Sequence, residues 1–152
     1  MLFISVSLWI TSGLCALAGT NCQHLGGSIQ TNFLNPTTTF GTAGGDLKGA
    51  IGVTILSLKQ NPNGTLTFYN QHHWETETGD TLQIAPAYAT GYPSGVAGLY
   101  AAIYPNGVEL TGGTGRFAGA TGKLSAWGAV DTKRNEVVLR YAGTVCFKDS
   151  DE

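Results

Sequence analysis

The residues best suited to chemistry lie in one short segment, 71–77, which reads QHHWETE. It holds two of the three histidines of the chain and two carboxylates. The flanking sequence alternates apolar and polar side chains, which is typical of a β-strand, and neighbours in a strand point to opposite faces. The segment is therefore divided into two sets, with Asn70, His72 and Trp74 on one face and His73, Glu75 and Glu77 on the other.

The face that carries Asn70 and His72 continues the apolar residues Leu66 and Phe68, so we expect it to point inward. A histidine there could act as a general acid or base, because burial easily shifts its reference pKa of about 6.5. The candidate catalytic residues are His72, Asn70 and Tyr141. The alternative is a hydrogen-bonded histidine with a purely structural role.

The opposite face presents His73, Glu75 and Glu77 as conceivable metal ligands. The first and the last of them lie about 13 Å apart along one strand, so a single ion would need ligands from neighbouring strands. The sequence has no second histidine cluster. We therefore expect a solvent-exposed outer face, with neither a metal nor a cofactor. The Gly-x-Ser-x-Gly pattern of a serine nucleophile is also absent from the sequence.

The elements that must position these residues are strands. Period-two alternation recurs along the chain, and no dozen-residue window after the N-terminal segment has helical spacing of apolar residues. Turn sequences rich in Gly, Pro and Asn separate the strands. The expected strands cover 24–33, 46–60, 66–75, 80–89, 97–104, 107–112, 119–131 and 137–146.

Eight antiparallel strands of this kind predict an all-β fold, an eight-stranded antiparallel β-barrel. Closure into a barrel removes both exposed sheet edges, and a barrel of this size is just wide enough to hold one small ligand. A two-sheet β-sandwich is the alternative that strand count alone leaves open. In the barrel, the residues expected to line the lumen and to bind a small hydrophobic molecule are Phe68, Asn70, His72, Trp74, Leu139 and Tyr141.

The first eighteen residues carry no charged side chain and end in Ala-Leu-Ala. This pattern predicts a signal peptide over 1–18, followed by a single domain over 19–148 and a short acidic tail over 149–152. Because the chain has eight basic and ten acidic residues, its charges nearly balance and create no strong electrostatic field. We expect no nucleic acid as a partner and, once the signal is removed, no membrane, for a protein that is secreted, extracellular or periplasmic.

Two cysteines remain after that cleavage, Cys22 and Cys146, one at each end of the domain. In an oxidising compartment they predict a disulfide that joins the first strand to the last, with a stabilisation of roughly 4 to 5 kcal/mol in the chain-entropy model. A metal site made by Cys22 and the nearby His24 is the alternative. Asn63-Gly64-Thr65 matches the pattern of an N-glycosylation acceptor.

The segment 112–122, GGTGRFAGATG, contains five glycines around one aromatic residue. Glycine adopts positive φ without a steric penalty, so the pattern predicts a tight turn that Phe117 anchors in the core. A phosphate-binding loop is the alternative, but it would require Lys-Ser or Lys-Thr and a following helix, whereas strand-like sequence follows here. The motif residues are Gly112, Gly113, Thr114, Gly115, Phe117, Gly119 and Gly122.

This glycine motif, near the C-terminal end of an all-β chain, resembles that of the allene oxide cyclase and dirigent superfamily, and in particular its small secreted proteins with an allene oxide cyclase barrel-like domain. The resemblance implies an eight-stranded barrel and possible trimers. It also implies cofactor-free activities, such as cyclisation or isomerisation, in which an apolar barrel holds a reactive substrate in one conformation. No catalytic residue of the superfamily can be carried over to this sequence.

Three functions follow as hypotheses. The first is a secreted barrel that binds a small hydrophobic ligand. The second is a cyclase or isomerase, in which His72→Ala would abolish turnover without unfolding the protein. The third is an extracellular structural or assembly protein with a filled barrel. The volume of the lumen separates the third hypothesis from the first two.

Overall fold

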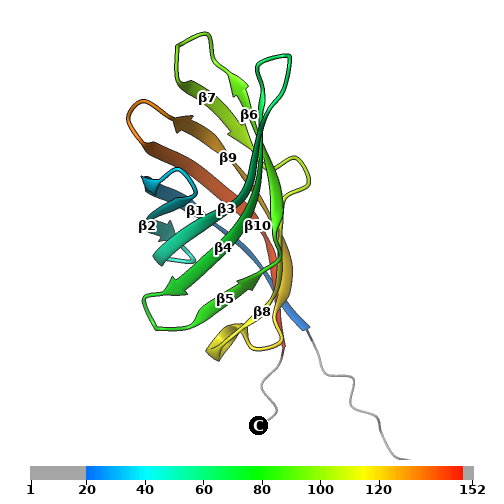
Figure 1. The fold of residues 1–152 in the computed structure, drawn as a ribbon. Helices are drawn as coiled ribbons and strands as arrows, with labels where there is room; N and C mark the ends of the chain where they lie inside the picture. The colour runs from blue at the N-terminus through cyan, green and yellow to red at the C-terminus, as the bar shows by residue number, and fades with distance from the viewer. Residues whose placement is uncertain (1–19, 149–152) are drawn as a thin grey trace, which may run out of the picture.

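The computed structural model describes residues 20–148, which form ten β-strands and one short 3-10 helix (Figure 1). In chain order these are β1 (Thr20–Asn35), β2 (Thr38–Gly45), β3 (Gly49–Gln60), β4 (Leu66–Thr76), β5 (Thr81–Ile84), β6 (Ala87–Pro93), β7 (Leu99–Ile103), β8 (Val108–Gly113), η1 (Gly115–Phe117), β9 (Thr121–Asp131) and β10 (Glu136–Lys148). The expected signal peptide, the first residue of the expected domain and the acidic tail lie outside the described residues.

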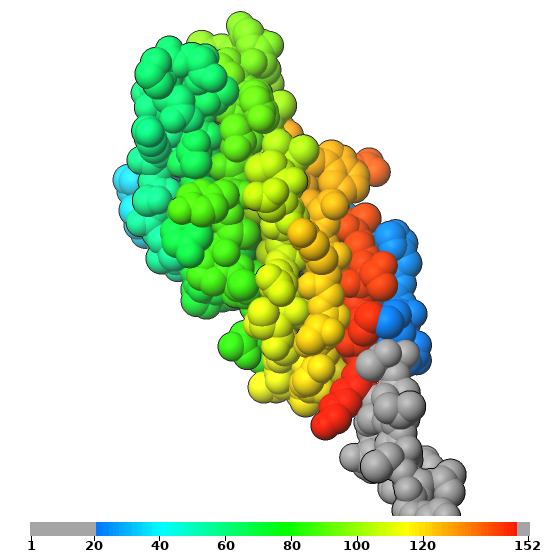
Figure 2. All heavy atoms as spheres, turned by 90° about the vertical axis from the view of Figure 1, so that its right-hand side faces the viewer, coloured from blue at the N-terminus to red at the C-terminus, as the bar shows by residue number. Residues whose placement is uncertain are grey.

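The ten strands occupy eight positions of a closed antiparallel barrel. Strands β5 and β6 both pair with β4, one beyond the other, and β7 and β8 share the adjacent β9 in the same way. Pairing of β10 with both β1 and β9 closes the ring. Figure 2 shows β8, β9, β10 and β1 side by side, in yellow, orange, red and blue. The predicted eight-stranded barrel is confirmed, and the sandwich is excluded.

Two of the eight barrel positions are each filled by two short strands, with a break in the chain pairing between them. Ala85 and Pro86 separate β5 from β6, because proline lacks the N–H that a sheet ladder requires. The turn Pro105-Asn106-Gly107 separates β7 from β8. The expectation of one strand over 80–89 is therefore wrong. Segments 97–104 and 107–112, expected as two neighbouring strands, together fill a single position.

Strand β2 was not expected from the sequence. Its inward positions carry small or polar side chains, Thr39, Gly41 and Ala43, whereas its one large apolar residue, Phe40, is half exposed. It therefore lacks the apolar alternation that indicates a strand. The expected strand 46–60 is also wrong in its first residues, because Asp46–Lys48 form the turn that connects β2 to β3.

The core is the interior of the barrel. In β4 every second residue from Leu66 to Thr76 is buried, and in β10 the buried residues are Val137, Leu139, Tyr141 and Val145. Each fully buried aliphatic side chain contributes about 1.5–3 kcal/mol by leaving water. The strand alternation inferred from the sequence therefore matches the side chains that the barrel buries. Within residues 20–148, no helix has the length and apolar character needed to cross a membrane.

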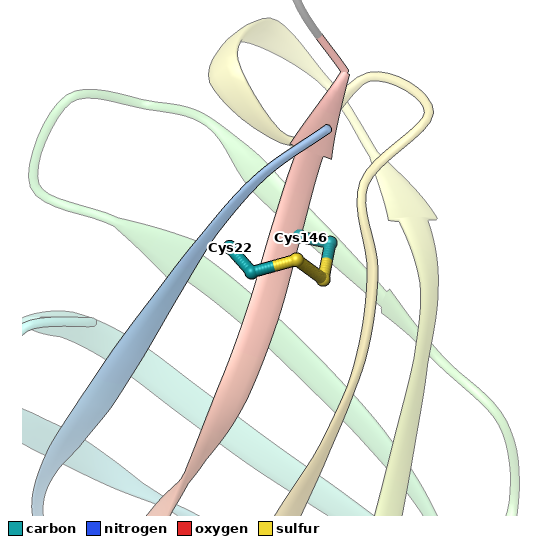
Figure 3. The surroundings of a disulfide bond; sticks show 2 residues. All are labelled: Cys22 and Cys146. Atoms are coloured by element: carbon teal, nitrogen blue, oxygen red, sulfur yellow. A yellow bond between two sulfur atoms is a disulfide. The ribbon is translucent and has the colours of Figure 1, made fainter. Parts of the chain in front are cut away.

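The predicted disulfide between Cys22 and Cys146 is confirmed (Figure 3). The two residues lie directly opposite each other where β1 pairs with β10, and 124 positions separate them in the sequence. The bond therefore joins the first and last strands across the seam at which the barrel closes. Constraining so long a loop in the unfolded chain stabilises the fold by roughly 4 to 5 kcal/mol in the chain-entropy model.

The two ends of the barrel differ in how far their hairpins project and in which segments lie across them. At the upper end, in the orientation of Figure 1, the β3–β4 and β6–β7 hairpins project beyond the shorter β1–β2 hairpin. Leu58 pairs with the inward-facing Phe68 and yet is 53% exposed, so apolar surface faces solvent at this end. The lower end holds the β2–β3 turn, η1 and both termini of the described chain.

Candidate functional site

The barrel lumen contains a cavity of about 70 Å³ whose lining is largely apolar. All six residues expected to bind a ligand line this cavity, four from β4 and two from β10: Phe68, Asn70, His72, Trp74, Leu139 and Tyr141. Strand alternation explains their common orientation, because every second side chain of a strand faces the same side. The structure thus brings these residues together, and their role in binding stays a prediction.

Halfway along the lumen, three polar side chains form what we call the wall cluster: Asn70, His72 and Tyr104. The Asn70 amide Nδ2 donates a hydrogen bond of 2.9 Å to the Tyr104 hydroxyl. The His72 Nε2 lies 2.9 Å from the same hydroxyl, and the two rings meet at an interplanar angle of 53°. All three residues are less than 8% exposed. The cluster is therefore a buried polar group in a lumen wall that is otherwise largely apolar.

Two atoms of the wall cluster lack a hydrogen-bond partner among residues 20–148. These are the Asn70 Oδ1 and the His72 Nδ1, both buried. Leaving a buried polar atom unpaired costs about 1–3 kcal/mol, and most buried polar atoms in proteins are paired. The wall cluster therefore carries unused hydrogen-bonding capacity in side chains that line the lumen.

Burial also sets the protonation state of the wall cluster. It lowers the pKa of His72 to about 4, with a smaller contribution from the charge of His73. Burial raises the pKa of Tyr104 to about 12, against the opposing effect of the hydrogen bond from Asn70. At neutral pH both groups are uncharged. The cluster can thus offer hydrogen bonds to a ligand without placing a charge in the lumen.

The lower end of the lumen is closed by a second group, which we call the floor: Leu47, Trp74 and Tyr141. Leu47 is fully buried. Its N–H donates to the Tyr141 hydroxyl at 2.9 Å, and its carbonyl accepts from the Trp74 Nε1 at 2.8 Å. The Tyr141 hydroxyl donates in turn to the Gly44 carbonyl at 2.9 Å. The polar atoms of both aromatic side chains therefore already form hydrogen bonds with the backbone of the turn and of the end of β2.

The glycine motif braces the floor from below. Phe117, the predicted anchor, is fully buried, and the guanidinium of Arg116 lies 4.6 Å from its ring centroid. That guanidinium donates to the Asp46 carbonyl at 3.1 Å, which ties η1 to the turn that carries Leu47. Gly115 has φ +54°, and a Cβ there would overlap the Asp80 carboxylate. The predicted tight turn is present, and strand β9 follows it.

The outer face of β4 is as expected from the alternation. His73 and Glu75 are exposed, and so is Glu77 after the strand end, where its carboxylate pairs with Lys48 at 2.7 Å. Among the residues that the structure describes, no group of three His, Cys, Asp or Glu side chains could hold a metal ion.

Sequence reasoning missed two residues of the lumen, Tyr104 and Leu47. Tyr104 follows β7 directly and extends the inward-facing row that includes Ala102, so alternation could have identified it. Its approach to β4 depends on strand pairing, because β6 pairs with both β4 and β7 and so brings together residues 32 and 34 positions apart. Leu47 had no comparable signal, because a lone leucine between charged and glycine residues reads as part of a strand or a turn.

Of the comparisons with known proteins, only the one with solved structures gives matches. No protein-family model matches the sequence, and no curated protein matches it. Among solved structures, the pterocarpan synthase dirigent protein GePTS1 matches over 94% of this chain and 100% of its own, with a TM-score of 0.38 and 13% sequence identity. The barrel described here rests on the strand pairing of this chain itself.

Proposed function

We propose that this protein binds a small, slender apolar molecule in the lumen of its barrel. The observation that carries the proposal is the cavity itself, which has apolar walls, a plugged floor and partly exposed apolar side chains at its upper end. Three alanines in the lining, Ala89, Ala102 and Ala126, keep this space open where larger side chains would fill it.

The size of the cavity limits the ligand. Its volume of about 70 Å³ has room for about five to seven water molecules at about 10–15 Å³ each. Sites for drug-sized molecules enclose about 300–1,000 Å³. A short alkyl chain therefore fits the lumen as it stands, and a larger molecule would require side chains to repack. A completely filled barrel, as in a purely structural protein, would have no such cavity.

The test is a titration with 1-chloropentane, followed by the methyl NMR signals of the lumen residues Ile29 and Leu139. We expect these signals to shift with saturation, while the outward-facing Val138 does not respond. Ala102→Leu should abolish the shifts by filling the lumen. Ala101→Leu, one residue away on the exposed face, is the matched control and should bind like the wild type. Absence of any lumen shift in the folded wild type would overturn the proposal.

The disulfide supports a place of action outside the reducing cytosol, because such bonds persist in oxidising compartments. We expect the protein to be recovered from its own source in the oxidised form, outside the cell. Native mass spectrometry without reduction would detect both the disulfide and any retained organic molecule. Recovery only as an intracellular dithiol would contradict this expectation.

A cofactor-free cyclase or isomerase is the second candidate, favoured by the unpartnered imidazole Nδ1 of His72 in the lumen. A buried neutral imidazole can exchange protons with a bound substrate. His72→Ala would then abolish turnover of a substrate found by mass spectrometry while the barrel stays folded. Unchanged turnover in that variant would exclude this role for His72.

A further inference from the structure

We propose that the wall cluster binds an uncharged hydroxyl group, so that the lumen selects apolar alcohols over carboxylates and over uncharged molecules that have no hydrogen-bond donor. This inference rests on the proposed lumen function and specifies the ligand class. It is carried by two buried, unpartnered polar atoms in side chains that line the cavity, the Asn70 Oδ1 and the His72 Nδ1.

The hydrogen bonds within the wall cluster determine whether each unpartnered atom is a hydrogen-bond donor or an acceptor. Tyr104 has one hydroxyl proton and two neighbours at 2.9 Å. If Asn70 donates to the hydroxyl oxygen, the hydroxyl can donate to the His72 Nε2. The neutral imidazole then carries its proton on Nδ1. In this arrangement a ligand in the lumen can pair with one donor, the His72 Nδ1–H, and one acceptor, the Asn70 Oδ1.

The other arrangements lead to the same outcome. If the imidazole Nε2–H donates to Tyr104 instead, the His72 Nδ1 becomes an acceptor. The Tyr104 proton then goes either to the Asn70 oxygen, after a half-turn of the amide that frees its N–H groups, or directly toward the lumen. Every arrangement in which both 2.9 Å contacts are hydrogen bonds leaves at least one donor and one acceptor for a ligand.

A hydroxyl group can pair with both the free donor and the free acceptor, because it both donates and accepts hydrogen bonds. A carboxylate only accepts, and its charge would be buried without compensation, since the described residues that line the cavity include no Lys or Arg. An ammonium group only donates, and no Asp or Glu lines the cavity either. A molecule without any polar group leaves the donor and acceptor unpaired. The cluster therefore discriminates by chemistry as well as by size.

The experiment compares three probes with the same five-carbon chain: pentan-1-ol, 1-chloropentane and pentanoate. Each is titrated at pH 7 into the intact, disulfide-bonded protein, with the Ile29 and Leu139 methyl signals as the readout. We expect pentan-1-ol to bind about tenfold more tightly than 1-chloropentane, as hydrogen bonding of this kind allows. Pentanoate should not bind measurably.

Variants separate this inference from the function on which it rests. In Asn70→Leu/His72→Leu/Tyr104→Phe the cluster is apolar, and the two uncharged probes should bind within about twofold of each other. His73→Leu, on the outer face of the same strand, is the matched control and should keep the preference. Equal binding of alcohol and chloride by the wild type, or binding of pentanoate, would overturn the hydroxyl inference and leave lumen binding intact. Failure of all probes would overturn the proposed function itself.

Discussion

The floor and the wall cluster lie in the same lumen and are each built around a tyrosine, yet they use their polar atoms differently. Each contains a buried tyrosine, Tyr141 in the floor and Tyr104 in the wall cluster. The Tyr141 hydroxyl is held by two backbone groups, the N–H of Leu47 in the β2–β3 turn and the carbonyl of Gly44 near the end of β2. The Tyr104 hydroxyl is held by two side chains that each leave another polar atom unpaired.

This difference separates a structural site from a candidate binding site. In the floor, each hydrogen bond fixes the turn that plugs the barrel, so the polar atoms stabilise the fold. In the wall cluster, the unpaired atoms reduce stability. Buried polar groups with unused capacity are uncommon in proteins, and functional sites are one place where such costs are tolerated. The comparison predicts opposite effects for substitutions in the two regions.

The largest effect is expected from removal of the plug in Leu47→Ala. A fully buried leucine leaves a cavity when it is truncated, so the free energy of unfolding should fall by about 2–5 kcal/mol. Chemical denaturation of the oxidised protein measures this change. Leu58→Ala, at a half-exposed leucine, is the control and should change stability by only about 0.5 kcal/mol. Similar losses in both variants would show that Leu47 is not a plug.

The next effect is a pH dependence of stability that His72 causes. Its pKa is lowered to about 4 in the folded protein, against 6.5 as the ordinary value. Between these two values the unfolded chain binds more protons, so stability is complete above pH 6.5 and falls as the pH decreases toward 4. The loss should approach about 3 kcal/mol. Denaturation of the wild type and of His72→Gln across this window isolates the contribution, and parallel curves would contradict it.

A smaller loss is expected for Tyr141→Phe, which removes the acceptor of the buried Leu47 N–H and the donor to Gly44. The free energy of unfolding should decrease by about 1–3 kcal/mol. The matched control is Tyr69→Phe, on the outer face of β4, where no large change is expected. If the two variants were equally stable, the hydrogen bonds of the floor would contribute nothing.

The smallest effect, and the one with the opposite sign, is expected for Asn70→Leu. Leucine has a similar volume and removes an unpaired buried oxygen, while Tyr104 keeps its contact with His72. Stability should stay the same or increase by up to about 1 kcal/mol. A loss as large as that of Tyr141→Phe, measured in the same denaturation series, would show that the wall cluster serves the fold.

The inward rows of β4 and β10 could be predicted from the sequence, because alternation is a local pattern and both strands carry it clearly. The disulfide and the glycine turn were also predictable, from the position of Cys22 and Cys146 and from the spacing of the glycines. The wall cluster as a unit was not. Tyr104 reaches His72 because β6 pairs with both β4 and β7, and the local alternation that points Tyr104 inward does not indicate that pairing.

The floor and strand β2 were beyond prediction for a related reason. Leu47 becomes a plug because the β2–β3 turn folds into the barrel, where Trp74 and Tyr141 bind its backbone. The inward side of β2 carries small side chains, which suit a crowded barrel interior and remove the apolar alternation from the sequence. Both features depend on packing between segments that are distant in the chain.

The most direct test of the contrast between the two regions is the orientation of bound pentan-1-ol, measured by intermolecular NOEs in the wild-type protein. We predict NOEs from the CH₂OH protons to the rings of His72 and Tyr104, with the alkyl chain against the apolar lining. NOEs that place the hydroxyl end at Trp74 and Tyr141, or on the outer face of the barrel, would contradict it.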